Sequence, residues 1–285
     1  MQSEIETPQD TNKSINFSLN GINLDEPIIM GILNVTPDSF FDGGQNFNNE
    51  EIVRKVNAME YEGAKIIDIG GYSSRPGAVN ISEEEELNRV LPIVKLIRSN
   101  FKDILISVDT FRSKIAEDCI NSGANIINDI SGGSLDSNMF ETISKLNVPY
   151  VLMHIKGTPQ NMQNTPTYID VTKEVYQYFE EKIKKLNTKG VYNIILDPGF
   201  GFGKTVEHNY ELLKNLDQFN SLGLPILVGF SRKSMINNVI NTTPEEALNG
   251  TTVLNTLALT KGTNILRVHD TKEANECIQL VKMIK

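Results

Sequence analysis

Eight short apolar runs recur along this chain of 285 residues, separated by segments with a helical period. Their apolar character is nearly continuous, which is typical of strands buried on both faces rather than of half-solvated antiparallel strands. The runs cover residues 28–33, 66–69, 104–108, 126–127, 150–153, 194–196, 226–228 and 265–268. Eight strand and helix units predict an α/β fold, a closed (β/α)8 TIM barrel, rather than an open sheet.

The segments between the runs carry helix signals. Ser82 with Glu85 predicts a capping box, and the segment 243–246, Thr-Pro-Glu-Glu, predicts a helix start. No linker divides the chain, so we expect one barrel domain over residues 27–285. Residues 1–26 are expected to form a tail with a possible short strand or hairpin.

Most of the runs end in a polar or charged residue. Because the carboxyl ends of parallel strands meet at one face of a barrel, these side chains are expected to surround one pocket. They are Asn34, Asp68, Asp109, Asn128 with Asp129, His154, Asp197, Ser231, and Arg267 with His269. The predicted pocket therefore holds both carboxylates and cations.

Composition excludes several classes of protein. A net charge of -9 and a pI near 5.0 argue against binding to nucleic acid or to an anionic membrane, which both favour basic surfaces. Cys119 and Cys277 lack the spacing of a zinc site or a disulfide framework. The polar N-terminus does not resemble a signal peptide, and a cytoplasmic small-molecule enzyme is the expected class.

Two loops at the predicted pocket have open interpretations. The loop 34–44 is rich in turn formers and contains Phe40 and Phe41, so it is either a closing lid or an ordinary βα loop with one Phe in the core. The loop 70–77 offers hydroxyls, amides and Arg75 for phosphate oxygens, but a solvated Gly/Ser loop has the same composition.

Three further segments point to ligand binding. Residues 197–205 resemble a nucleotide-binding P-loop, but Pro198 stands where that pattern requires Gly. Ser231 and Ser234 are expected near a helix N-terminus that favours an anion. Arg267 and His269 share one side of a strand and suggest an anion clamp. The role of His154 stays open.

Taken in order, these segments resemble the dihydropteroate synthase family of pterin-binding barrels. The segments that carry the resemblance are residues 30–40, 73–77, 107–110, 128–132, 153–154, 197–204, 231–234 and 267–269. The resemblance extends from about residue 27 to residue 285. It implies a transferase of folate synthesis, a sulfonamide target, that condenses 6-hydroxymethyl-7,8-dihydropterin diphosphate with 4-aminobenzoate and releases pyrophosphate. It also suggests a homodimer.

The same resemblance implies roles for individual residues. The pterin is expected at Asp109, Asn128, Asp197, Lys233 and Arg267. The diphosphate is expected at Asn34, Ser74, Arg75, Arg267 and His269, with Asn34 also binding Mg²⁺. The 4-aminobenzoate is expected against Phe40, Pro76, Phe202, Lys233 and Ser234. Lys233, Arg267, His269 and Asp38 are the expected catalytic residues.

The chemistry of the residues agrees with this division. Carboxylates suit the donors of a pterin edge, whereas a diphosphate requires cations and a hard metal. A pterin-binding methyltransferase is one alternative, but it would not need the cations of segments 231–234 and 267–269 for a diphosphate. A non-catalytic pterin-binding protein is the other, and the intact set of cations and Asn34 argues against it. One departure is that Tyr72 and Ser74 stand where the family commonly has an acid and a threonine.

Overall fold

The computed structural model describes residues 19, 21–22, 24, 26–35, 41–42, 46–73, 79–162, 164 and 166–284. Eight parallel strands form its central sheet. They are β1 (Ile28–Asn34), β4 (Ala64–Gly70), β5 (Leu105–Asp109), β6 (Ile126–Asp129), β7 (Tyr150–Met153), β8 (Ile194–Asp197), β9 (Leu227–Val228) and β10 (Ile265–Val268). Two short antiparallel strands, β2 (Phe41–Asp42) and β3 (Asn46–Phe47), pair with each other between β1 and the first described helix.

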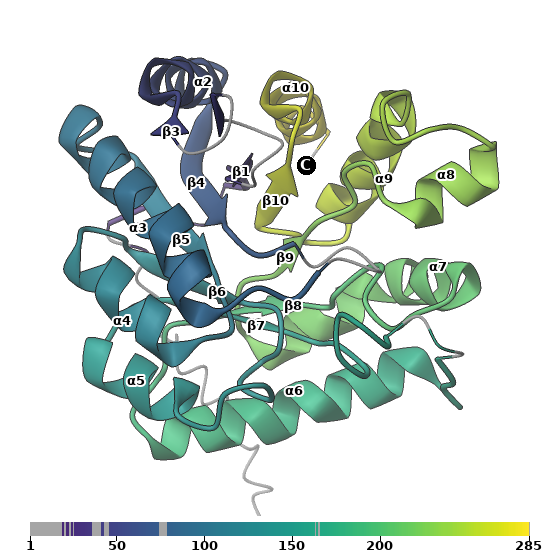
Figure 1. Cartoon of the computed structure of the whole chain (residues 1–285). Coiled ribbons are helices and arrows are strands. Elements are labelled where there is room, and N and C mark those ends of the chain that lie inside the picture. The colour runs from purple at the N-terminus through teal and green to yellow at the C-terminus, as the bar shows by residue number, and fades with distance from the viewer. Residues whose placement is uncertain are drawn as a thin grey trace, which may run out of the picture.

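Helices follow the strands and surround them (Figure 1). They are α2 (Asn49–Tyr61), α3 (Glu83–Asn100), α4 (Ser113–Asn121), α5 (Met139–Leu146), α6 (Val171–Thr188), α7 (Val206–Lys214), the 3-10 helix η1 (Leu216–Leu222), α8 (Ser234–Ile240), α9 (Leu248–Thr260) and α10 (Thr271–Lys282). None of the helices in the described part of the chain is long and apolar enough to cross a membrane.

The sheet closes on itself. Its strand order is β8-β7-β6-β5-β4-β1-β10-β9, and a parallel bridge between Leu196 and Ile226 joins the last strand to the first. The amide of Leu196 donates to the carbonyl of Pro225 at 2.8 Å across this closure. The predicted (β/α)8 barrel is therefore confirmed.

Of the two helix starts predicted from the sequence, the structure has one at the predicted residue and the other at a later residue. The Ser82 hydroxyl caps α3 by accepting from the Glu85 amide at 3.1 Å, but the Glu85 carboxylate binds Arg89 instead of completing the capping box. The helix start predicted at residues 243–246 is wrong: these residues form a turn, and α9 begins at Leu248. There, Glu246 donates to the Thr243 carbonyl and the chain turns before the helix begins.

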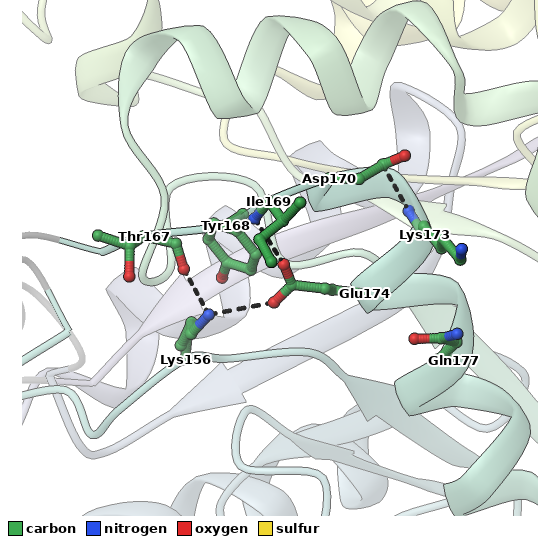
Figure 2. Close-up of a pocket in the computed structure, with 8 residues that line it drawn as sticks. All are labelled: Lys156, Thr167, Tyr168, Ile169, Asp170, Lys173, Glu174 and Gln177. Carbon is green, nitrogen blue, oxygen red and sulfur yellow. Dashed lines mark hydrogen bonds and ion pairs between the residues drawn. The ribbon is translucent and has the colours of Figure 1, made fainter.

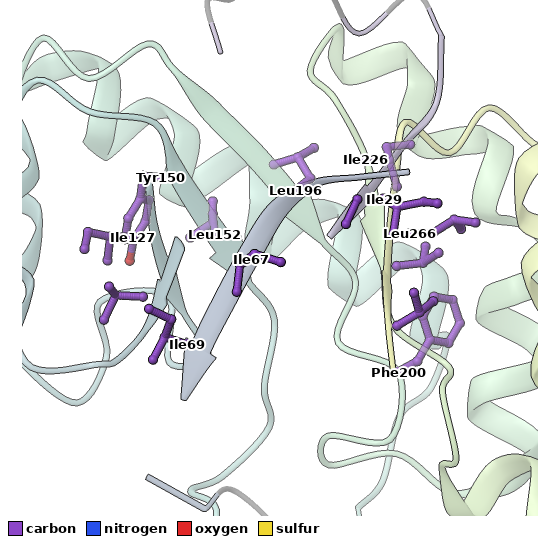
Figure 3. Packing of buried hydrophobic residues seen from close by; sticks show 14 of the residues in the cluster. Ile29, Ile67, Ile69, Ile127, Tyr150, Leu152, Leu196, Phe200, Ile226 and Leu266 are labelled. Atoms are coloured by element: carbon purple, nitrogen blue, oxygen red, sulfur yellow. The ribbon is translucent and has the colours of Figure 1, made fainter. Parts of the chain in front are cut away.

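Alternation along the strands divides the core in two. Outward side chains, such as Ile67, Leu196 and Leu266, pack between the barrel and its helices, and Figure 3 shows part of this cluster. Inward side chains at the amino ends of the strands form a second cluster inside the barrel. These are Ile28, Met30, Ile66, Leu105, Ile126, Val151, Ile195, Leu227 and Ile265. Apolar side chains thus fill the interior of the barrel at the amino ends of the strands.

The segment before β1 contributes to the inner cluster at the amino ends of the strands. Leu19 is fully buried within the inner cluster and pairs with Ile22 through an isolated antiparallel bridge. This bridge lies in the region where a short strand or hairpin was predicted. Residues 1–18 lie outside the described part of the chain.

Candidate active site

The inward positions change character toward the carboxyl ends of the strands. Two residues beyond Ile66, Ile126, Ile195 and Ile265, the same alternation places Asp68, Asn128, Asp197 and Arg267. Asp109 lies beside Asn128 in the register of β5 and β6. The apolar floor is therefore covered by a layer of charged and amide side chains at the mouth of the barrel.

Arg267 is the centre of this layer. Its Nε donates to Asp68 Oδ2 at 2.7 Å, and its Nη2 donates to Asp109 Oδ2 at 2.9 Å. Asn128 Nδ2 donates to the same Asp68 oxygen at 3.0 Å. The guanidinium is held in a fixed plane by two carboxylates, so it can present its face and its remaining N–H groups to a ligand.

Several polar atoms beside this network have no partner within the described part of the chain. Asp68 Oδ1, Asn128 Oδ1 and Ser107 Oγ are all buried without a hydrogen bond. Buried polar groups in folded proteins are nearly always satisfied by protein, ordered water or ligand. The mouth of the barrel therefore offers acceptors suited to a ligand rich in N–H donors.

Burial raises the proton affinity of the carboxylates here. It raises the pKa of Asp109 to about 7, although the charge of Arg267 acts in the opposite direction. It also raises the pKa of Asp197, against the opposing charge of Lys233. Ionising these groups in a dry site is costly, and a ligand that donates hydrogen bonds to them would lower that cost.

Asp197 lies where β8 turns into the following loop. The amide of Gly199 donates to its Oδ1 at 2.8 Å, and Oδ2 accepts no hydrogen bond from any described residue. Gly199 has a φ of 69°, and a Cβ at this position would overlap the carbonyl oxygen of His154. Glycine is thus required here, because both the backbone conformation and the close approach exclude a side chain.

Lys233 reaches the same side of the mouth from the loop before α8. Its Nζ donates to the Phe200 carbonyl at 2.6 Å and lies 4.7 Å from the centroid of the Phe202 ring. Burial lowers the pKa of Lys233 to about 8, while the charge of Asp197 opposes that shift. Lys233 and Phe202 therefore form one wall of the mouth, with the ammonium beside an aromatic face and under the influence of the Asp197 charge.

His269 is a neutral partner rather than the cation that an anion clamp implied. Burial, followed by the charge of Arg267, lowers its pKa to about 4. Ser231 Oγ accepts from the His269 amide at 3.3 Å and lies 2.9 Å from His269 Nδ1. The neutral imidazole carries one N–H, and Nδ1 shares its hydrogen bond with the Ser231 hydroxyl.

Asn34 and Ser234 occupy two edges of the mouth. Asn34 ends β1 and is partly exposed; its Oδ1 is 3.6 Å from the point that a Cβ of Gly70 would occupy. Ser234 is exposed at the first residue of α8, where free amides point outward. Ser231, by contrast, precedes α8 and is bound to His269.

The other predicted residues are Asp38, Phe40, Ser74, Arg75 and Pro76, and they lie outside the described residues. The description of the second loop ends at Ser73, directly after Tyr72. The Tyr72 hydroxyl accepts from Gln160 Nε2 at 2.6 Å, and its ring meets Phe111 edge to face with centroids 5.1 Å apart. Tyr72 thus joins the loops after β4, β5 and β7.

Sequence reasoning assigned no role to two buried groups. Asp68 was one of the residues at the strand ends. Because it follows the inward-facing Ile66 by two residues, its side chain could have been predicted to face inward and to bind Arg267. Lys204 belongs to the segment 197–205, which resembles a P-loop but lacks one of its glycines. Its Nζ lies 2.9 Å from His154 Nδ1. Asp129, next to Asn128, faces outward and accepts hydrogen bonds from Tyr150 and the loop amides after β6.

A separate depression lies outside the barrel mouth, between the loop after β7 and the start of α6 (Figure 2). Its main charges bind each other: Lys156 Nζ is 3.2 Å from Glu174, and Glu174 also accepts from the Ile169 amide. The Asp170 side chain caps α6 through the Lys173 amide. With these groups already paired, the depression is a weaker candidate site than the barrel mouth.

Known proteins match nearly the whole barrel. A family model described as pterin binding enzyme matches residues 30–269. The chain is 45% identical over 263 residues to the dihydropteroate synthase of Escherichia coli strain K12, a match that covers 92% of this chain and 93% of that protein.

Solved structures give the same result. The dihydropteroate synthase of Yersinia pestis in a sulfonamide drug complex matches with a TM-score of 0.88 and 40% identity, over 94% of this chain and 98% of that chain. The Xanthomonas albilineans dihydropteroate synthase with 4-aminobenzoic acid matches with a TM-score of 0.85 and 36% identity, over 92% of this chain and 94% of that one.

The arginine network yields a stability prediction. Arg267→Met leaves Asp68 and Asp109 buried without their cation and should lower the free energy of unfolding by about 3 to 5 kcal/mol at pH 8. Arg267 opposes the rise of the Asp109 pKa to about 7, so its removal should raise that pKa further; the loss should then be largest at alkaline pH and shrink as the pH falls toward 7, where Asp109 is protonated in the variant. Urea denaturation at several pH values measures both effects.

Arg232→Met is the matched control. Arg232 pairs with Asp270 at 2.7 Å, but 40% of its side chain is exposed, and exposed pairs contribute less than about 1 kcal/mol. Equal losses of stability in the two variants would contradict a special role for the buried network.

Proposed function

Because the chain belongs to the dihydropteroate synthase family of pterin-binding enzymes, we propose that its barrel mouth condenses 6-hydroxymethyl-7,8-dihydropterin diphosphate with 4-aminobenzoate. The family acts as transferases in folate biosynthesis. The observation that carries the proposal for these residues is the buried ion pair of Asp109 with Arg267 at the end of the barrel where Asp197 lies, whose pKa the charge of Lys233 lowers against the effect of burial.

The pterin ring would lie on the inner wall of the mouth. Its amino-pyrimidinone edge presents neighbouring N–H donors, which match the free oxygen of Asp197 and the buried oxygen of Asn128. Asp109 accepts from Arg267 and holds the guanidinium plane against the ring. Lys233 would meet a ring acceptor from the opposite side. These contacts bind and orient the ring without a covalent bond.

The diphosphate would lie between the ends of β1 and β10. Arg267 supplies positive charge there, and His269, whose pKa burial lowers to about 4 in the free protein, supplies an N–H. Ser74 and Arg75 belong to the same proposal through the family resemblance alone.

Asn34 fits a Mg²⁺ ion that is held mainly by its substrate. Mg²⁺ commonly keeps several waters and takes few protein ligands plus phosphate oxygens, and an amide oxygen is a suitable hard donor. No cluster of three or more His, Cys, Asp or Glu side chains that could hold a metal occurs among the described residues, so these residues offer no complete cage. When bound, Mg²⁺ would neutralise the charge that develops on the departing diphosphate.

The 4-aminobenzoate would lie on the outer wall. The partly exposed ring of Phe202 offers a flat apolar face, and Lys233 Nζ lies beside it at 4.7 Å from the ring centroid. Ser234 presents the first residue of α8 to a carboxylate. Phe40 and Pro76 complete this proposed pocket by resemblance. A sulfonamide, which mimics the same substrate, would compete for it.

In the proposed mechanism the chain positions two reactants and supports a leaving group. The Arg267 guanidinium and the His269 N–H stabilise negative charge on the diphosphate as its bond to the pterin methylene carbon breaks. The arylamine attacks the same carbon, so no side-chain nucleophile is needed. Holding the two rings in the correct geometry, with water excluded, supplies much of the rate.

The function is tested by following pyrophosphate release and dihydropteroate formation together. Both products should appear in equal amounts only when pterin diphosphate, 4-aminobenzoate and Mg²⁺ are all present, and a chelator should abolish both. Pyrophosphate release without 4-aminobenzoate, or transfer of a methyl group from a methylated pterin, would overturn the proposal.

A second prediction concerns the pterin edge. Asp197→Asn turns one acceptor into a donor that faces a donor and should weaken pterin binding by about 2 to 4 kcal/mol. Titration calorimetry measures the pterin affinity, and the affinity of the same variant for inorganic pyrophosphate serves as the control, because Asp197 does not face the diphosphate. Unchanged pterin affinity would remove Asp197 from the site.

We also propose that a second copy of the chain covers α9. This helix contains no Asp, Glu, Lys or Arg, and apolar side chains lie on its outer side as well as its inner side: Leu254 and Leu259 are buried, whereas Val253 and Leu257 are 49% and 45% exposed. Since each copy carries a net charge of -9, an uncharged surface is the one most favourable for self-association.

The oligomeric state tests this surface. Val253→Asp and Leu257→Lys should each convert a homodimer to monomers in analytical ultracentrifugation while the barrel stays folded. Ile169→Lys is the matched control, because Ile169 is an isolated, fully exposed apolar residue before α6. A wild-type monomer at high concentration would refute the proposed dimer.

A further inference from the structure

The loop between β8 and α7 has its backbone held by side chains rather than by regular structure. Lys204 Nζ donates to the Gly199 carbonyl at 2.9 Å and to the Phe202 carbonyl at 3.2 Å. Asn209 Oδ1 accepts from the Gly201 amide at 2.7 Å. The conformation of the loop therefore depends on a lysine within it and an asparagine on the next helix.

Lys204 is buried in a pocket of neutral acceptors. Besides the two carbonyls, it donates to His154 Nδ1 at 2.9 Å, so its three N–H donors match three acceptors. Burial lowers the pKa of Lys204 to about 7, although the charge of Asp197 opposes the shift. Burial and the charges of Lys204 and Lys156 lower the pKa of His154 well below its usual value, so His154 stays a neutral acceptor.

The loop that Lys204 ties together carries the outer wall of the mouth. The Phe200 carbonyl accepts from Lys233, and the Phe202 ring lies beside the same ammonium. The Phe200 side chain points the other way, into the outer core (Figure 3). Displacing the loop would therefore move the Phe202 ring and the Lys233 ammonium together.

We propose that Lys204 is a positioning residue for the second substrate: by binding the Gly199 and Phe202 carbonyls and His154, it sets the Phe202 ring and Lys233 against the arylamine. The proposal rests on the proposed function, since it concerns the wall assigned to 4-aminobenzoate. It also explains why a lysine stands in a pattern that resembles a P-loop. The ammonium turns inward to carbonyls of its own loop and is not directed to a phosphate.

The two substrates should respond differently. Four inner-wall residues, Asp68, Asp109, Asn128 and Arg267, have no hydrogen bond to Lys204 or to its loop carbonyls, and only Asp197 is tied to that loop, through the Gly199 amide. Loss of Lys204 should therefore raise the KM for 4-aminobenzoate, whose proposed wall lies wholly on loops, more than the KM for the pterin diphosphate. A purely structural role would instead change both constants, or neither, along with stability.

The experiment compares Lys204→Met with Lys182→Met in the full chain, using steady-state kinetics with each substrate varied. Lys182 is the matched control, because its Nζ also donates to a loop carbonyl, that of Gly132 at 2.8 Å, but in the loop after β6. We expect Lys204→Met to raise the KM for 4-aminobenzoate at least tenfold and the KM for pterin diphosphate less than threefold. Lys182→Met should leave both within twofold.

A pair of variants at His154 covers the case in which Lys204→Met does not fold. His154→Asn keeps an acceptor near the position of Nδ1 and should retain the wild-type KM for 4-aminobenzoate, whereas His154→Leu removes the acceptor and should raise it severalfold. Unchanged KM for 4-aminobenzoate in Lys204→Met, or equal values for the two His154 variants, overturns the proposal. If the wild type forms no dihydropteroate, the proposed function itself fails, which is a separate outcome.

Discussion

The guanidinium of Arg267, held between Asp68 and Asp109, is the interaction on which the rest of the site depends. It joins β10 to β4 and β5, and Asn128 on β6 extends the same network through Asp68. A charge layer of this kind is stable in a barrel mouth only because each ion has a partner. The network therefore combines two roles: it satisfies the buried charges of the apoprotein, and it fixes the plane against which a flat ligand can bind.

The mouth has two walls with separate supports. The inner wall consists of strand residues, so the hydrogen bonding of the barrel itself fixes its geometry. The outer wall consists of Phe202 and Lys233, which belong to loops, and its geometry comes from lysine-to-carbonyl hydrogen bonds at Phe200, Gly199 and Phe202. This division suits a reaction between two substrates, because strand residues orient the first ring and loop residues receive the second, with the Asp197 carboxylate and the Gly199 amide joining the two walls.

Burial also changes what the charged groups can do. His269 is neutral and Asp109 has a pKa of about 7, so the site contains less fixed charge near neutral pH than its composition suggests. Arg267, whose pKa is raised by Asp68 and Asp109 against the effect of burial, stays a cation. Electrostatic support for a leaving anion then falls mainly on Arg267, with neutral N–H groups around it.

The sequence by itself determined the eight strands, their parallel closure and most of the inward polar residues, because the period of two along a buried strand is a local property. It missed the start of α9, where Thr243 and Pro244 form a turn before the helix. It could not identify the partners of Arg267, since Asp68 lies 199 residues away in the chain. Nor could it show that His269 is neutral or that Lys204 turns inward, because protonation and side-chain direction depend on burial and distances that exist only once the barrel has closed.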